Sequence, residues 1–300
     1  MKKSEKEKTA EKKTGAKVRA CMAFAKSIRP GWRADALAGL LIFILKLLGV
    51  RKKIALDNIA LCLPEKTCEE RRKILAESYE SMVWTGVEML AWQRDASLLD
   101  RMLVEISGRE YIDEALAAGR GAIIISAHIG SWEYAAAWLA RHYPFYGVVR
   151  HSDSPFQREL IEEMRETSGL MTISKDASMK RVVTVLRKNE VFGALADQHG
   201  GGEGLLVPFF GRLTRTPAGP AAFSVLTGAP MIPLLARRLE PFKFSLKFSP
   251  PMPRPDKSLS RDEAIADLTA RMNREFEKMI IEDPGQWLWQ HRRFRKEDEE

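Results

Sequence analysis

Apolar and polar positions follow two different periods along this 300-residue chain. Between residues 18 and 95 the apolar positions recur every three or four residues, as at Leu75, Tyr79 and Met82, which predicts amphipathic helices. From about residue 120 onward, short apolar runs typical of buried strands alternate with stretches of helical spacing. The two patterns divide the chain into a helical part and a mixed part.

Strands alternating with helices predict the fold class of the mixed part. The predicted strands cover residues 122–126, 146–149, 170–173, 191–196, 231–236 and 242–248. The predicted helices cover residues 131–142, 155–168, 176–188, 217–227 and 261–281. This order indicates an α/β fold with a largely parallel central sheet flanked by helices, preceded by the helical region.

Three segments follow from these patterns. Residues 1–20 hold eight Lys or Arg against three Glu, so residues 1–17 are expected to be a basic disordered tail. Residues 18–95 are expected to form an N-terminal, membrane-associating helical region. Residues 96–300 are expected to form the α/β domain, and the two together one catalytic unit.

The net charge of +8 points to an anionic partner such as nucleic acid, an anionic membrane surface or an acidic protein. The chain has no RRM or zinc-finger pattern, so nucleic-acid binding is a remote alternative and no nucleic acid is expected. Cys21, Cys62 and Cys68 form no CxxC pair, which fits a reducing compartment. There is no HExxH motif, and we expect neither a metal site nor a cofactor.

The most hydrophobic stretch is ALAGLLIFILKLLGV at residues 36–50. It is 15 residues long and contains Lys46, whereas a membrane span needs about 20 apolar residues. Basic residues flank it on both sides, which suits a helix in a membrane interface. A buried core helix explains the pattern equally well, so both interpretations stay open.

The candidate chemistry lies where the first predicted strand of the mixed part ends. His128 follows that strand, and Glu133 lies five residues later in the first turn of a helix. A neutral imidazole can act as a general base while a carboxylate fixes its tautomer, although such pairs also occur without catalysis. Arg150 and the pair Asp197–Gln198 follow two other strands, and ligands of such sheets bind beyond the carboxyl ends of strands.

The block ISAHIGSWE, residues 125–133, resembles the H-x4-D/E motif of glycerolipid acyltransferases, in the version of the bacterial lipid A biosynthesis (late or secondary) acyltransferase family. Five further blocks resemble this family in order: Asn58–Glu65, Tyr146–Arg150, Ala196–Gln198, Pro208–Gly211 and Pro284–Phe294. The resemblance covers about residues 35–295. Ser131 departs from the family's Asn-Trp-Glu version, and His151 replaces the usual proline after Arg150.

The resemblance implies a glycerolipid-acyltransferase-like fold and an acyl transfer. A fatty acyl chain would pass from acyl carrier protein or coenzyme A to a hydroxyl of a membrane glycolipid, above all a lipid A precursor. A lyso-ornithine lipid or a lysophospholipid is the alternative acceptor. The implied location is the cytoplasmic face of the bacterial inner membrane, with peripheral or monotopic attachment.

The resemblance also implies roles for single residues. His128 would deprotonate the acceptor hydroxyl, and Glu133 would orient His128 and stabilise its cation. Backbone N–H groups at Gly130 and Ser131, together with Arg150, would bind the oxyanion. The remaining predicted substrate-binding residues are Asp197, Gln198, Phe209, Phe210 and Gly211. We expect an apolar acyl pocket beside His128 with both phenylalanines close to it; their alternative role is core packing.

Overall fold

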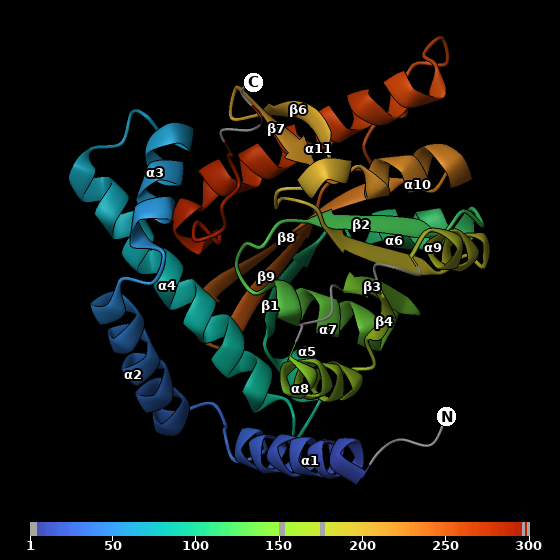
Figure 1. The fold of residues 1–300 in the computed structure, drawn as a ribbon. Coiled ribbons are helices and arrows are strands. Elements are labelled where there is room, and N and C mark those ends of the chain that lie inside the picture. The colour runs from blue at the N-terminus through green and yellow to red at the C-terminus, as the bar shows by residue number, and fades with distance from the viewer. Residues whose placement is uncertain (1–4, 150–153, 175–177, 296–297, 299–300) are drawn as a thin grey trace.

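A seven-stranded sheet forms the centre of the structure, a computed structural model that describes residues 5–149, 154–174, 178–295 and 298 (Figure 1). The strands are β1 (Leu103–Ser107), β2 (Ala122–Ser126), β3 (Phe145–Val149), β4 (Met171–Ser174), β5 (Val191–Leu195), β6 (Leu205–Phe209), β7 (Arg212–Thr216), β8 (Met231–Glu240) and β9 (Lys243–Phe248). The order in the main sheet is β1-β9-β8-β2-β5-β3-β4, and β6 pairs with β7 in a separate hairpin.

Most neighbouring strands of the main sheet are parallel, as the sequence predicts. Strands β8, β2, β5, β3 and β4 run in one direction, while β9 pairs with β8 antiparallel and with β1 parallel. The predicted α/β class is confirmed. Strand β1 and the β6–β7 hairpin are not among the predicted strands: Glu105 interrupts the apolar residues of β1, and Pro208 within β6 is unfavourable in a strand.

Helices cover both faces of the sheet and form the N-terminal region (Figure 1). They are α1 (Glu5–Ala25), α2 (Trp32–Leu48), α3 (Lys52–Cys62), α4 (Cys68–Ala91), α5 (Leu98–Arg101), α6 (Glu110–Ala117), α7 (Trp132–His142), α8 (Pro155–Glu166), α9 (Ser178–Arg187), α10 (Gly219–Thr227) and α11 (Arg261–Glu282). Capping boxes begin two of the longest, at Thr67–Glu70 for α4 and at Ser260–Glu263 for α11.

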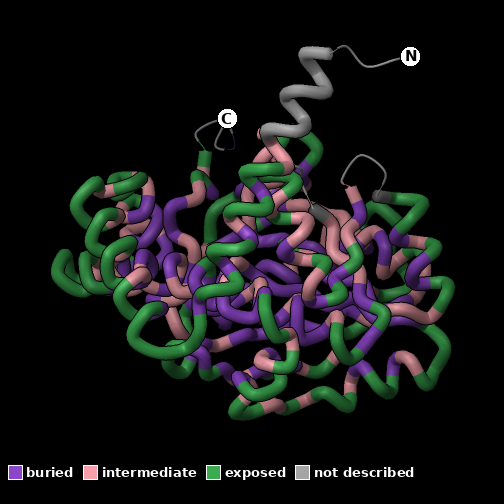
Figure 2. Tube along the Cα trace, turned by 90° about the horizontal axis from the view of Figure 1, so that it is seen from below, coloured by how far each residue is buried: buried purple, intermediate pink, exposed green. Residues whose placement is uncertain are grey.

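The sheet separates two apolar layers. Side chains alternate across a strand, so Ile124 of β2 faces a layer that contains Trp138 and Leu139 of α7. Ile123 and Ile125 face the other layer, which contains residues of α3, α10 and α11. Figure 2 shows the buried residues gathered in the middle of the molecule, with exposed helices around them. We call the two sides the α7 face and the α11 face.

The N-terminal region differs from the expectation at its beginning. Helix α1 spans Glu5–Ala25, so the prediction of a disordered tail is wrong for residues 5–17. Further along, Arg238 of β8 donates to Glu88 of α4 through both Nε and Nη2 at 2.8 Å, and Glu88 is fully buried. This ion pair fastens the helical region to the sheet.

Helix α2 packs on α4 with a narrow face and leaves its apolar side outside. Only Ala34 and Ala38 of this helix are buried. Leu40, Phe43 and Leu47 are 57%, 63% and 73% exposed. The interpretation of residues 36–50 as a core helix is therefore wrong. Within the residues that the structure describes, no helix is long and apolar enough to cross a membrane.

Candidate active site

The loop after β2 places His128 at the carboxyl edge of the sheet. Gly130 has a φ of +59°, and a Cβ there would overlap the Ala236 carbonyl oxygen, so the position requires glycine. The Gly130 N–H donates to the Gln286 carbonyl at 3.0 Å, and the Ser131 N–H donates to the Ala236 carbonyl at 3.2 Å. Both N–H groups are occupied, so the prediction that they bind the oxyanion is wrong.

The segment from Pro284 to His291 holds this loop from behind. The Leu288 N–H donates to the His128 carbonyl at 3.0 Å, and Trp287 forms an antiparallel bridge with Ile129. From α3, the Asn58 amide donates to the carbonyls of Trp289 and His291 at 2.8 and 2.7 Å. Two of the family-like blocks, although far from His128 in sequence, therefore support its loop in the fold.

His128 is oriented by Asp197, which follows β5. The His128 ring Nδ1 lies 2.7 Å from Asp197 Oδ1, and the His128 backbone N–H donates to Asp197 Oδ2 at 2.9 Å. The Trp287 indole N–H donates to the same Oδ2 at 2.8 Å. Asp197 is almost fully buried, whereas the His128 side chain is 19% exposed. The carboxylate is fixed by three donors and the imidazole edge remains accessible.

Electrostatics favour a charged Asp197 and a basic His128. Burial works against a charged imidazole, but the charge of Asp197 and its hydrogen bond outweigh burial and raise the pKa of His128. Burial opposes a charged carboxylate in the same way, yet His128 and Trp287 hold the pKa of Asp197 well below its usual range. An ionised Asp197 requires the proton on His128 Nδ1, which leaves Nε2 as the acceptor.

Glu133 has a different partner from the one predicted. Its carboxylate accepts two hydrogen bonds from Arg165 of α8, at 2.6 and 3.2 Å. The prediction that Glu133 orients His128 is wrong, because the ring nitrogen that needs orienting is bound to Asp197. The charge of Glu133 still contributes to raising the pKa of His128, so its predicted support for the cation has a physical basis.

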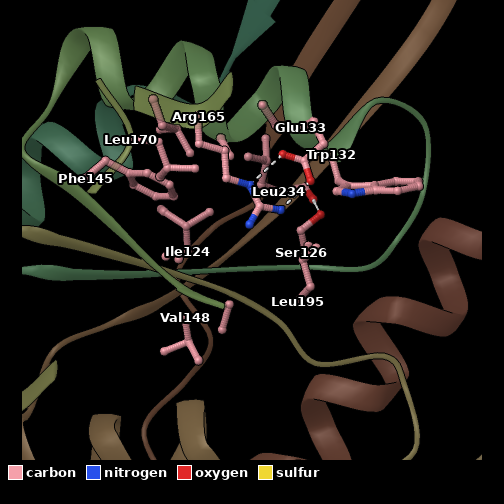
Figure 3. A pocket seen from close by; sticks show the side chains of 16 residues that line it. Ile124, Ser126, Trp132, Glu133, Phe145, Val148, Arg165, Leu170, Leu195 and Leu234 are labelled. Carbon is pink, nitrogen blue, oxygen red and sulfur yellow. Dashed lines mark hydrogen bonds and ion pairs between the residues drawn. The ribbon is translucent and has the colours of Figure 1, made fainter. Parts of the chain in front are cut away.

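An apolar pocket opens beside the His128 loop, on the α7 face (Figure 3). Its cavity volume is about 90 Å³. Ser126 and Trp132 line one end, and Phe145 and Leu170 line the other, with the Glu133–Arg165 ion pair between them. The pocket is lined mostly by carbon, and its polar end lies at the strand ends near His128. The chemistry of this lining suits an acyl chain.

The two predicted pocket aromatics lie elsewhere. Phe209 is fully buried in the α11 face, 6.0 Å from the Trp287 ring centre, and Phe210 packs against the same layer. Neither lines the apolar pocket, so their predicted place beside it is wrong and core packing is right. Phe210 and Gly211, with φ values of 49° and 73°, form the two-residue turn between β6 and β7.

The other predicted residues divide between the site and its surroundings. Gln198 directly follows Asp197 and is half-buried. Arg150 lies outside the described residues. The sequence alone assigns no role to His291. In the structure, its Nε2 accepts the His199 N–H at 3.2 Å, and burial lowers the pKa of His291 to about 4. It is therefore a neutral ring next to the dyad, with its proton on Nδ1.

Comparison with known proteins shows the family of the chain. Residues 18–296 match the family model of the bacterial lipid A biosynthesis acyltransferases. The chain belongs to this family. It is therefore an acyltransferase that acts on a lipid acceptor, and the resemblance stated from the sequence is confirmed.

Individual relatives show how broad the similarity of this acyltransferase is. The lipid A biosynthesis lauroyltransferase of Escherichia coli K12 is 30% identical over 83% of this chain and 80% of its own length. A phosphatidylinositol mannoside acyltransferase of Mycobacterium tuberculosis is 34% identical over 52% of this chain and 51% of its own. Among solved structures, a 1-acyl-sn-glycerophosphate acyltransferase of Thermotoga maritima covers 82% of this chain and 96% of its own, at 15% identity and a TM-score of 0.36.

Proposed function

We propose that this acyltransferase transfers a fatty acyl chain from a thioester of acyl carrier protein or coenzyme A to a hydroxyl of a membrane glycolipid, most simply a lipid A precursor. One observation carries the proposal: His128 is oriented by a buried Asp197, and its ring contacts that of Trp132, at 5.2 Å between centroids, which lines one end of the apolar pocket. The pocket would hold the acyl chain and the dyad would activate the hydroxyl. The phosphatidylinositol mannoside acyltransferases among the relatives widen the range of acceptors to other glycolipids. A lyso-ornithine lipid or a lysophospholipid is the alternative acceptor.

The chemistry needs one proton carrier. The acceptor hydroxyl gives its proton to Nε2 of His128, and its oxygen attacks the thioester carbonyl carbon. The resulting imidazolium is stabilised by Asp197 through Nδ1–H. The tetrahedral intermediate collapses, the carbon–sulfur bond breaks, and the thiolate leaves with the proton from Nε2. An ester and a free thiol are formed.

Other residues support this step. The Glu133–Arg165 pair spans the pocket, and its carboxylate adds favourable charge near the His128 cation. Arg150 is the remaining predicted donor to the oxyanion or to a substrate phosphate. The helical region and the α/β part act as one catalytic unit in this proposal, because Asn58 of α3 holds the segment that backs His128.

The proposed attachment to a membrane rests on the exposed apolar side of α2. Its exposed apolar side would enter one leaflet, and flanking Lys and Arg would meet anionic headgroups. We place the enzyme at the cytoplasmic face of the bacterial inner membrane, attached without spanning it. The basic surface of the chain also suits an acidic carrier protein as donor.

The test compares His128→Ala with the matched substitution His142→Ala, which changes a histidine at the end of α7 outside the site. Purified protein is assayed with an acyl thioester and a lipid A precursor in mixed micelles. We expect His128→Ala to lose about 10²–10⁴ in rate, the usual scale for a general base, and His142→Ala to keep it. Near-native turnover by His128→Ala would overturn the dyad. Lipid mass spectrometry of cells with and without the protein would identify the acceptor.

A further inference from the structure

A second cavity lies between α3 and residues 292–295, which directly follow the segment that holds the His128 loop. Its volume is about 640 Å³. Unlike the apolar pocket, it is lined by charged groups, with Phe294 and Asn58 at its wall. The charged groups are Lys53, Asp57, Arg292 and Arg295.

The cations of this cavity outnumber the carboxylates that the described residues place in its wall. Lys53, Arg292 and Arg295 make no ion pair among the residues that the structure describes, and Asp57 is the one carboxylate of the described residues in the cavity wall. Several other exposed cations of the chain do make ion pairs, as in Lys46–Glu80 at 2.7 Å. Three cations around one carboxylate leave an excess positive charge of two. Such a cavity is suited to an anion.

The cavity lies close to His128. The Leu288 N–H binds the His128 carbonyl at 3.0 Å, and Arg292 follows Leu288 by four residues. Even a fully extended chain spans at most about 3.6 Å per residue, so the Cα atoms of Leu288 and Arg292 are within about 14 Å of each other. Asn58 contacts the same segment from the cavity wall, through the carbonyls of Trp289 and His291.

The cavity and the acyl pocket lie on different sides of the sheet. The acyl pocket is lined by Ile124 and other residues of the α7 face. Phe294 packs against the α11 face, as does α3 through Ala55 and Ile59. A donor chain on one side therefore leaves the other side open for the acceptor. Lys53 also lies just after α2, whose last turn exposes Leu47 and Leu48 by 73% and 68%.

We infer that this cavity binds a phosphate group on the headgroup of the acceptor lipid. A guanidinium presents paired donors that match phosphate oxygens, and the ammonium of Lys53 adds a point charge. A phosphate on the donor, from coenzyme A or the carrier's prosthetic group, has the same chemistry. The acceptor is favoured because the cavity adjoins exposed apolar α2 and lies across the sheet from the acyl pocket. The inference rests on the proposed function.

The experiment uses the full-length protein in neutral detergent micelles with a phosphorylated lipid A precursor and the same lipid after a phosphatase has removed its phosphates. The variant is the double substitution Lys53→Gln and Arg292→Gln. We expect its KM for the phosphorylated lipid to rise about 10–100-fold, up to about tenfold for each cation removed, with kcat within about threefold. The wild-type preference for the phosphorylated lipid should disappear in the variant.

The matched control removes two cations elsewhere, by Arg120→Gln with Lys257→Gln in the cavity near the amino end of β2. An equal rise in KM in this control would show general charge attraction and overturn the inference. A rise in KM for the thioester donor instead of the lipid would assign the cavity to the donor and overturn it too.

Direct binding separates this inference from the proposed function. Without a thioester, wild-type protein should bind the phosphorylated lipid more tightly than the dephosphorylated one. Equal binding would refute the phosphate site even if acyl transfer occurs. Phosphate-dependent binding without any acyl transfer would refute the proposed function and leave the phosphate site in place.

Discussion

The loop at residues 127–131 and helix α2 are built in opposite ways. In the loop, backbone groups of His128, Gly130 and Ser131 are bonded to residues from other parts of the chain. In α2, only two alanines are buried, and the large apolar side chains face outward. The loop is held in place by hydrogen bonds within the protein, whereas the large apolar side chains of α2 are exposed.

This difference separates positioning from attachment. A general base works only when its ring is held within hydrogen-bond reach of the reacting proton, which the buried Asp197 and Trp287 ensure. A surface that enters a lipid layer needs apolar area and no fixed partner. Substitutions confined to one region should therefore change its own task and spare the other's.

The largest effect should come from the carboxylate that orients the base. Asp197→Asn removes the charge that stabilises the His128 cation and permits the wrong tautomer, so kcat should fall about 10²–10⁴-fold. Glu133→Gln should lower kcat much less, because Glu133 makes no hydrogen bond to the ring in the described residues. Steady-state kinetics on both variants decide this. A larger loss with Glu133→Gln would restore the His–Glu dyad.

The next effect concerns stability. Gly130→Ala combines a positive φ with overlap against the Ala236 carbonyl, so the free energy of unfolding should fall by about 2–4 kcal/mol. Gly39→Ala in α2 is the matched control: a Cβ there meets nothing within 4 Å, and alanine favours a helix by up to about 1 kcal/mol. Urea unfolding curves measure both. Equal stability of the two variants would show that the loop is not held as the structure indicates.

Membrane binding should respond to α2 alone. Phe43→Ser with Leu47→Ser removes two exposed apolar groups, each contributing about 1.5–3 kcal/mol when buried in lipid, so vesicle affinity should fall at least about tenfold. Hydrolysis of a soluble acyl thioester should stay unchanged. Leu213→Ser with Leu239→Ser, also exposed, is the control for co-sedimentation with anionic vesicles. Loss of binding in the control pair instead would place the membrane contact elsewhere.

The smallest effect is a shift in the pH profile. The base must be neutral, so kcat/KM should fall as pH drops through the pKa of His128. That pKa is raised by Asp197, so the acid limb should lie above the usual value of 6.5. In Asp197→Asn the limb should move to lower pH, because burial then acts without the compensating charge. An acid limb that stays at the same pH in this variant would show that another group titrates.

The sequence predicts the sheet well and the site only in part. Runs such as residues 122–126 are apolar enough to define buried strands, and β2 covers the predicted residues. The partner of His128 was not predictable from spacing, because Asp197 comes from another strand end. The N–H groups of Gly130 and Ser131 were predicted to be free because their acceptors, Gln286 and Ala236, are more than 100 residues away.

The resemblance of a block to the family also does not show what role its residues play. Phe209 and Phe210 looked like substrate-binding residues, but one fills the core and the other forms a tight turn. Arg293 is fully buried and binds the carbonyl of Arg215 and the hydroxyls of Thr214 and Thr216. A block can resemble a family because its residues hold the fold, and only contacts distinguish this from chemistry.

The support of His128 by residues 284–291 has a consequence for how the protein is made. Ribosomes add about 5–20 residues per second, so roughly ten seconds or more separate the synthesis of His128 from that of its supporting segment. During this time the loop lacks Gln286 and Leu288 as hydrogen-bond partners, and Asp197 lacks the Trp287 indole. A nascent chain that already carries His128, Asp197 and the acyl pocket thus still lacks part of the hydrogen bonding that fixes the base. We therefore expect activity only after residues 284–291 have been added, by which time α2 has had time to reach a membrane.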